Sequence, residues 1–327
     1  MLRAAALAGV LCAAGCSRPE STALGNEPGS SRPSSAVNSA EPRASAPASG
    51  ATRAHRAPDA PPPLDSEELG RRYAWLKGAD GVPEVHDTLD RRFAAPAGFR
   101  RVDVEPTSFA AFLRQLPLAA PDTPVRTYRG DVLHPASDAR IAGVVAIDVG
   151  RADLQQCADA VMRLHAEWLW AKGERTQSYR AAAGTALPYE RYRRGERLVP
   201  EGATLSWKPM ARPSDEYRTF RGYLDAVFAW ANTVSLERQA RSVTRDELRA
   251  GDFFILPGNP GHAVLVLDVA ASGAERRALL GQSFMPAQSF QILRPRAGEA
   301  WFDLAAERDL RTPFWRPFPW TSLKRLP

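Results

Sequence analysis

From about residue 64 onward, apolar and polar residues recur with the periods of helices and strands. Residues 66–78 and 107–117 have the three-and-four spacing of short amphipathic helices, and Thr107 or Ser108 is a suitable cap for the second. Residues 214–239 predict one long helix. Its apolar face has the spacing of a core-facing stripe and contains Phe220, Tyr223, Leu224, Val227 and Phe228.

Strands are predicted where short apolar runs rich in β-branched residues lie between turn residues. Residues 124–130 and 141–150 form two such runs, and the second is apolar enough to be central in a sheet. Four more runs follow one another further along the chain, at residues 252–256, 262–268, 276–282 and 289–294. Helices therefore come first and an antiparallel sheet after, which is the pattern of an α+β domain.

Residues 1–15 have a different pattern, in which Arg3 precedes an apolar run from residue 4 to residue 14. This run is too short to span a bilayer and is typical of an export signal peptide. Small residues at 13–15 precede Cys16, which is the arrangement of bacterial lipoprotein signals that are cut and acylated at the cysteine. An ordinary secretory signal with a leftover cysteine is the alternative, and both predict that the chain leaves the cytoplasm.

Residues 16–63 consist largely of Ala, Ser, Pro, Glu and Arg, with almost no branched or aromatic side chain. Such a segment buries too little apolar surface to offset the entropy of ordering, so we expect a disordered tether. Residues 64–327 contain no second linker and no repeat, and their apolar content is ample for a single globular domain. The chain is therefore expected to be an exported lipoprotein of the bacterial cell envelope, attached to the membrane by its lipid.

The formal net charge of the chain is +6, and nearly all of its cationic side chains are arginines. Four of them cluster within residues 189–197, namely Arg191, Arg193, Arg194 and Arg197. This cluster is a candidate contact for peptidoglycan or another anionic envelope polymer, although a solvated surface explains most charge runs. Zinc-ligand spacing, a phosphate-binding glycine loop, a dinucleotide fingerprint and a nucleic-acid module are all absent from the sequence. We therefore expect no metal, no cofactor and no nucleic-acid partner, and the sequence does not indicate an oligomeric state.

Cys157 is the thiol that remains if Cys12 leaves with the signal and Cys16 carries lipid. Asp153 is a suitable N-cap, with Gln156 three residues later as the second member of a capping box, which places Cys157 in the first turn of a helix. Unpaired N–H groups in that turn favour a thiolate and can stabilise an oxyanion. The alternative is a structural cysteine, because Cys157 lies on the apolar face of the same helix.

His262 is the histidine best placed to accept a proton from this thiol. His165 lies eight residues further along the cysteine's own helix, roughly 12 Å away. His262 instead opens a predicted strand after the Pro- and Gly-rich loop 257–261. A thiol nucleophile needs an imidazole base, and a strand holds such a base rigidly. A surface histidine at the end of a loop is the alternative.

The group that orients His262 can be predicted from the hairpin that follows it. A turn centred on residues 272–273 places Ser283 opposite His262, and a one-residue slip places Gln282 there instead. Gln282 is preferred, because its side-chain amide can accept a hydrogen bond from one ring nitrogen and leave the other free. Gln156 and Ser283 are weaker candidates for contacts with the substrate or the oxyanion.

A cysteine in the first turn of a helix, followed far downstream by Gly-Asp, an apolar strand, a short loop and Gly-His, resembles the NlpC-type and papain-like amidases of bacterial cell walls. This resemblance implies a papain-like α+β fold, in which the helix bearing Cys157, the nucleophile, packs on an antiparallel sheet bearing His262, the base. Residues 154–170, 258–270 and 281–288 are also similar to the uncharacterised bacterial family catalogued as domain of unknown function 4846, which would cover most of the folded domain.

These features together predict a lipid-anchored thiol amidase or peptidase that acts on peptidoglycan peptides or a similar amide. Cys157 attacks the amide, His262 moves the proton, Gln282 orients the imidazole, and the Cys157 N–H at the helix start holds the oxyanion. Two alternatives use the same fold, namely a non-catalytic envelope binding or scaffold lipoprotein and an acyl transferase that uses an amine in place of water. Stacking of the tryptophans on sugar rings is a further hypothesis, and a role in the core is the commoner use of such residues.

Overall fold

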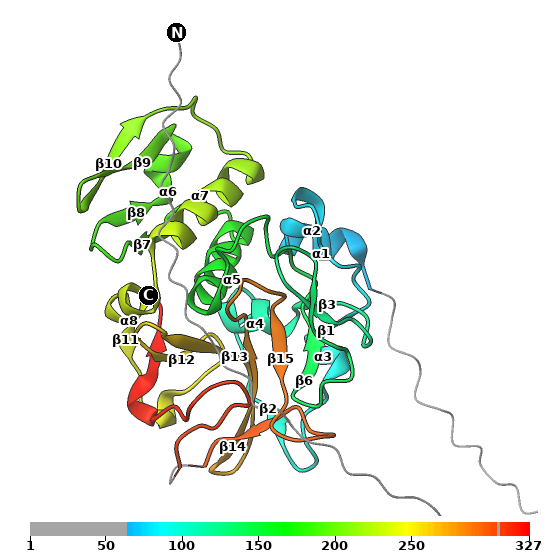
Figure 1. Cartoon of the computed structure of the whole chain (residues 1–327). Helices are drawn as coiled ribbons and strands as arrows, with labels where there is room; N and C mark the ends of the chain where they lie inside the picture. Colours follow the sequence, from blue (N-terminus) through cyan, green and yellow to red (C-terminus); the bar gives the residue numbers. More distant parts are fainter. Residues whose placement is uncertain (1–63, 306–307) are drawn as a thin grey trace, which may run out of the picture. The chain divides into compact units, whose positions relative to one another are not determined.

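The computed structural model describes residues 64–305 and 308–327, which belong to one compact unit spanning residues 61–327 (Figure 1). The predicted signal peptide 1–15, the acylated Cys16 and the tether 16–63 lie outside the described residues. Within the described part of the chain, no helix has both the length and the apolar character needed to cross a bilayer.

The unit is an α+β domain built around a nine-stranded antiparallel sheet (Figure 1). The main path runs β11 (Arg241–Ser242), β17 (Leu323–Arg325), β12 (Phe253–Leu256), β13 (His262–Ser272), β14 (Glu275–Gln282), β15 (Gln291–Leu293) and β6 (Ile141–Val144). Two short strands complete the sheet, because β2 (Arg100–Arg101) pairs with β13 and β16 (Phe302–Asp303) pairs with β14.

The remaining elements are helices and four two-stranded sheets. The helices are α1 (Ser66–Arg72), α2 (Trp75–Gly78), α3 (Leu89–Arg92), α4 (Phe109–Arg114), α5 (Cys157–Ala171), α6 (Tyr189–Arg193), α7 (Tyr217–Trp230), α8 (Thr233–Gln239) and the 3-10 turns η1 (Arg245–Glu247) and η2 (Trp320–Ser322). The small sheets pair β1 (Asp87–Thr88) with β3 (Pro117–Leu118), β4 (Val125–Arg126) with β5 (Val132–His134), β7 (Ser178–Arg180) with β8 (Ala186–Pro188), and β9 (Glu196–Glu201) with β10 (Thr204–Pro209).

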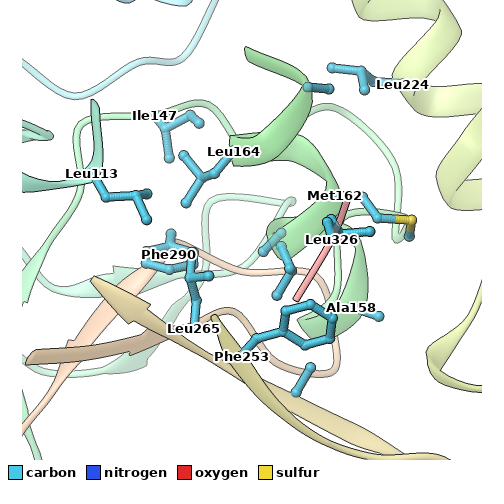
Figure 2. Packing of buried hydrophobic residues seen from close by; sticks show 14 of the residues in the cluster. Leu113, Ile147, Ala158, Met162, Leu164, Leu224, Phe253, Leu265, Phe290 and Leu326 are labelled. Carbon is cyan, nitrogen blue, oxygen red and sulfur yellow. The ribbon is translucent and has the colours of Figure 1, made fainter. Parts of the chain in front are cut away.

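Strand β13 is buried on both of its faces, which explains its continuous apolar run. Up to Leu267, its odd-numbered residues, such as Leu265, pack in one core cluster with Leu164 of helix α5. Figure 2 shows part of this cluster, including Leu265, Phe253 and Leu164. Even-numbered residues of the same stretch, such as Val264, instead pack with Phe318 in a second cluster on the other face. The period of two along a strand therefore separates the layer that contains the cysteine helix from a layer formed by the C-terminal segment.

The predicted helices are present, and two of them are each divided into two shorter helices. Helix α4 begins after Ser108, whose hydroxyl oxygen accepts the N–H of Ala111 at 3.1 Å, so the predicted cap is confirmed. The long helix predicted over residues 214–239 is divided into α7 and α8. The division occurs because the Asn232 side chain accepts the N–H of Ser235 at 2.9 Å and starts a new helix. Residues 66–78 are likewise divided, into α1 and α2.

The strands predicted over residues 252–294 are present as β12 to β15, in consecutive antiparallel order. The prediction that residues 141–150 form a central strand is wrong, because β6 ends after Val144 and lies at the end of the sheet order. Burial explains the apolar run at this position. Beyond β6 the chain remains buried, and the Trp75 side chain donates to the carbonyl of Ala146 at 2.8 Å. An apolar run thus predicts that a segment is buried, but it does not predict whether the segment is a central or an edge strand.

Candidate functional site

Cys157 is the first residue of helix α5, and Gln156 is its N-cap. The Gln156 N–H donates to the Asp159 carboxylate at 3.0 Å. The prediction of Asp153 as the cap is therefore wrong. Asp153 lies before the helix, where its carboxylate accepts the Gln156 side chain at 3.0 Å and the backbone N–H of Ala287 at 2.7 Å. The reason is that a tight turn over residues 154–156 separates Asp153 from the helix and leaves its carboxylate to hold the 283–288 segment instead.

The Cys157 sulfur lies against the first residues of strand β13. Its thiol donates to the carbonyl oxygen of Gly261 at 3.7 Å, and the backbone N–H groups of Ala263, Ala158 and Cys157 itself point to the sulfur. Gly261 and Ala263 are the two neighbours of His262, so the sulfur lies beside the backbone of the predicted base. The sulfur of the predicted nucleophile therefore contacts the backbone on both sides of the predicted base, which lies 105 residues further along the chain, and no hydrogen bond joins it to the imidazole in the described structure.

The charge state of this thiol follows from its burial, since only 4% of Cys157 is exposed. Burial raises the pKa of Cys157 to about 11, and the nearby Asp159 carboxylate adds to this rise. The three backbone N–H groups lower the pKa, but by less than burial raises it. The sulfur is therefore a protonated thiol at neutral pH in this structure.

His262 is fully buried at the start of β13, and its ring Nε2 lies 2.8 Å from the side-chain oxygen of Gln282. The other ring nitrogen, Nδ1, has no hydrogen-bond partner among the residues that the structure describes. Burial lowers the pKa of His262 to about 4, although the Gln282 hydrogen bond opposes this shift. The imidazole is therefore neutral, with its proton on Nε2 facing Gln282 and a lone pair on Nδ1.

Gln282 reaches His262 through a register that differs from the predicted one. The hairpin tip is one residue further along than predicted, since Ser272 pairs with Glu275. A bulge between Val266 and Asp268 then shifts the pairing again, and the last pair of the two strands is Leu265 with Gly281. The predicted placement of Ser283 directly opposite His262 is thus wrong. Gln282 contacts the imidazole from just beyond the paired segment, where the two strands separate.

The two weaker candidates, Gln156 and Ser283, hold the backbone around the site. The Ser283 hydroxyl lies 2.8 Å from the carbonyl oxygen of Gln288 and 3.2 Å from that of Gln155. The Gln156 side chain is bound to Asp153. These contacts fix the start of helix α5 against the segment that follows β14, and neither side chain contacts the imidazole.

An aromatic cover over His262 was not predicted from the sequence. The rings of Phe284 and Trp315 lie 4.8 Å and 4.9 Å from the imidazole, and Phe318 lies 6.2 Å away. Trp315 also lines an open groove of about 730 Å³ between residues 257–260 and residues 313–316. The aromatic run near the C-terminus was the available signal, but its position over the histidine depends on the tertiary structure.

Residues 89–325 match the family described as domain of unknown function 4846. The chain belongs to this family. The matched span includes Cys157, His262, Gln282 and the aromatic cover. Neither a curated protein nor a solved structure matches the chain. In this member of the family, the described residues contain no group of three His, Cys, Asp or Glu side chains that could hold a metal ion.

A buried charge network in this family member supports the start of α5, and sequence reasoning missed it. Arg163 is fully buried, and its guanidinium lies 2.7 Å from the carboxylates of both Asp148 and Glu167 and 2.9 Å from the Gln155 side-chain oxygen. Burial alone would raise the pKa of Asp148, but Arg163 and Arg221 together lower it to about 2. The network thereby fixes Gln155, two residues before the cysteine. The four-residue spacing of Arg163 and Glu167 was the only local signal.

Three of the four arginines in the cluster of residues 189–197 are paired with acidic side chains, and Arg197 instead donates to the backbone carbonyls of Tyr192 and Glu196. Arg194 lies 2.7 Å from Glu190, Arg193 lies 2.8 Å from Asp215, and Arg191 pairs with Glu196. These pairs favour the interpretation of the cluster as a solvated surface.

Proposed function

We propose that this protein is a thiol amidase or peptidase of the cell envelope, with a papain-like arrangement of a cysteine helix on a histidine-bearing sheet. One observation carries the proposal. The Gln282 oxygen lies 2.8 Å from Nε2 of His262, which leaves Nδ1 as an unpartnered proton acceptor in the described structure, beside the backbone that contacts Cys157. A fixed tautomer with one free ring nitrogen is what a base for a thiol requires.

In the proposed reaction, Nδ1 of His262 takes the thiol proton as the Cys157 sulfur attacks the amide carbon. The carbonyl oxygen becomes an oxyanion, which the backbone N–H groups at the start of α5 stabilise. The C–N bond then breaks, and the imidazolium returns its proton to the leaving amine. Water hydrolyses the thioester with His262 again as the base, which restores the thiol and releases a carboxylic acid. An amine in place of water in this last step would give acyl transfer.

Two rearrangements are part of this proposal. The thiol donates to the Gly261 carbonyl in the present structure, so it must turn toward Nδ1 of His262. Trp315 or Phe284 must also move, since their rings cover the imidazole. Proton transfer during the attack is consistent with a neutral thiol and a neutral imidazole, whose pKa values are about 11 and about 4.

A second candidate function is a non-catalytic envelope binding or scaffold protein. The observation that favours it is burial, because Cys157 is 4% exposed and His262 is fully buried. The widely separated pKa values also mean that no thiolate–imidazolium pair exists at neutral pH. Chemical access to the thiol therefore separates the two candidates.

Alkylation of Cys157 by iodoacetamide tests this access. In the unchanged protein we expect slow alkylation at pH 7, with a rate that rises roughly tenfold per pH unit toward pH 11, because the thiol pKa is about 11. Trp315→Ala should accelerate alkylation by about tenfold at each pH by opening the cover. Trp320→Ala is the matched control, since Trp320 packs on Phe254 at 5.5 Å and lies outside the cover. Equal rates in both variants would mean that Trp315 does not control access.

Gln282→Ala tests the orienting contact. We expect kcat for amide cleavage to fall by about 10- to 100-fold, because the imidazole loses the acceptor that fixes its tautomer. The ¹⁵N chemical shifts of the His262 ring should then show a mixture of tautomers in place of one. Gln288→Ala is the control, because Gln288 is an equally buried glutamine whose amide bonds Gln291 and does not contact the histidine. An unchanged tautomer in Gln282→Ala would contradict the assigned role.

The proposed location is the membrane surface of the envelope, where peptidoglycan peptides or similar amides are available. Cys16→Ser is expected to release the protein from membranes, since the lipid is the only attachment that we propose. Fractionation of cells followed by immunoblotting would measure the release. Retention of the variant in washed membranes would contradict the lipoprotein assignment and leave the thiol chemistry untouched.

A further inference from the structure

We infer that the groove between residues 257–260 and residues 313–316 binds an extended acidic peptide, which is the part of the substrate next to the thiol. This inference rests on the proposed function, because it assigns a substrate class to the same site. The groove has a volume of about 730 Å³. That space is within the usual range for sites that bind small molecules and short peptides.

Both walls of the groove are connected to the cysteine and the histidine. Trp315 lines one wall, and its ring lies 4.9 Å from the His262 imidazole. Pro260 lines the other wall and directly precedes Gly261, whose carbonyl oxygen lies 3.7 Å from the Cys157 sulfur. A chain that lies in the groove is therefore next to the thiol once the Trp315 ring moves aside.

The walls are held in place by contacts from other elements. Thr233, at the start of helix α8, exchanges hydrogen bonds of 3.3 Å with the backbone of Gly258. On the opposite wall, the Arg140 guanidinium lies 4.4 Å above the Phe314 ring, and the His134 ring lies 5.2 Å from it. The groove is thus largely formed before a ligand arrives, which reduces the entropy cost of binding.

The lining selects the chemistry of the ligand. It consists mainly of proline and aromatic surfaces, which favour an extended chain over a helix or a compact group. Arg316 is the single charged residue of the lining, and none of the lining residues is acidic. Arg316 is exposed and has no ion-pair partner among the described residues. An extended peptide with a carboxylate side chain complements both features.

Calorimetric titration of the full chain carrying Cys157→Ala tests the inference, since this variant binds without turnover. The probes are two capped pentapeptides of alanine, one with glutamate at its second and fourth positions and the other with glutamine there. We expect the glutamate peptide to bind about fivefold more tightly, as suits one exposed Arg–carboxylate pair. Arg316→Gln should remove this preference, and Arg316→Lys should keep part of it. Arg311→Gln is the control, because Arg311 is an exposed arginine outside the groove.

Several results would overturn the inference. These are equal binding of the two peptides, no binding of either peptide, or the same loss in Arg311→Gln as in Arg316→Gln. Failure of the proposed function gives a different result. An inert Cys157 in a protein that still prefers the glutamate peptide would remove the enzyme and leave the groove assignment. Cleavage of both peptides at equal rates by the protein with Cys157 intact would remove the groove assignment and leave the enzyme.

Discussion

Cys157→Ser is expected to lower kcat/KM for amide cleavage by at least about 10³-fold while the protein remains folded. Serine is close to cysteine in size, so the buried space at the start of α5 stays filled. Its hydroxyl has a much higher pKa than a thiol, and a neutral imidazole with a pKa of about 4 is too weak a base to activate it. Peptide cleavage measured together with thermal unfolding would separate loss of chemistry from loss of structure.

Ser289→Ala is the matched control for this substitution, because Ser289 is a buried hydroxyl whose hydrogen bonds are with the backbone of Arg126 and not with the start of α5. It should retain most of the activity. A Cys157→Ser variant that no longer folds would favour the structural interpretation of the cysteine. Full activity in that variant would exclude Cys157 as the nucleophile.

Arg163→Ala is expected to have the largest effect on stability, a loss of about 3–5 kcal/mol in the free energy of unfolding. The substitution leaves two carboxylates, those of Asp148 and Glu167, buried without the guanidinium that lies 2.7 Å from each. Urea denaturation of both proteins at pH 7 would measure the difference. We also expect lower activity, because Arg163 holds the side chain of Gln155, which lies two residues before Cys157.

The pH dependence of stability provides a second measurement of the same network. The folded pKa of Asp148 is about 2, below its ordinary value of 3.8, so its ionised form stabilises the fold. This contribution is present above about pH 4 and is lost as the pH falls toward 2. In Arg163→Ala the loss over this pH window should become smaller, because the main source of the lowered pKa has been removed.

Arg151→Ala is the control for both measurements, since Arg151 forms an ion pair of 2.6 Å with Asp80 in which both side chains are more than four-fifths exposed. Solvent screens such a pair, so the urea midpoint should remain unchanged. Equal destabilisation by Arg151→Ala and Arg163→Ala would show that burial does not set the strength of the Arg163 network.

Local sequence signals predicted several parts of this structure. The strands β12 to β15 were recognisable because each is a short apolar run between turn residues, and consecutive strands pair when the turns are short. The Ser108 cap was recognisable because its hydroxyl oxygen accepts a hydrogen bond from a backbone N–H only three residues away. The contact of Gln282 with His262 was predicted from the reach and chemistry of its side chain, although the bulge in β13 makes the strand register differ from the predicted one.

The sequence by itself therefore determined the α+β class and the order of the C-terminal strands. Only the tertiary structure decided the exposure and charge state of the Cys157 thiol. The aromatic cover of His262 comes from Phe284 and Trp315, and the network that supports the start of α5 comes from Asp148, Arg163 and Gln155, which lie far apart along the chain or on different elements. Periodicity and capping depend on neighbours within a few residues, whereas burial and pKa depend on every group that folding brings into contact.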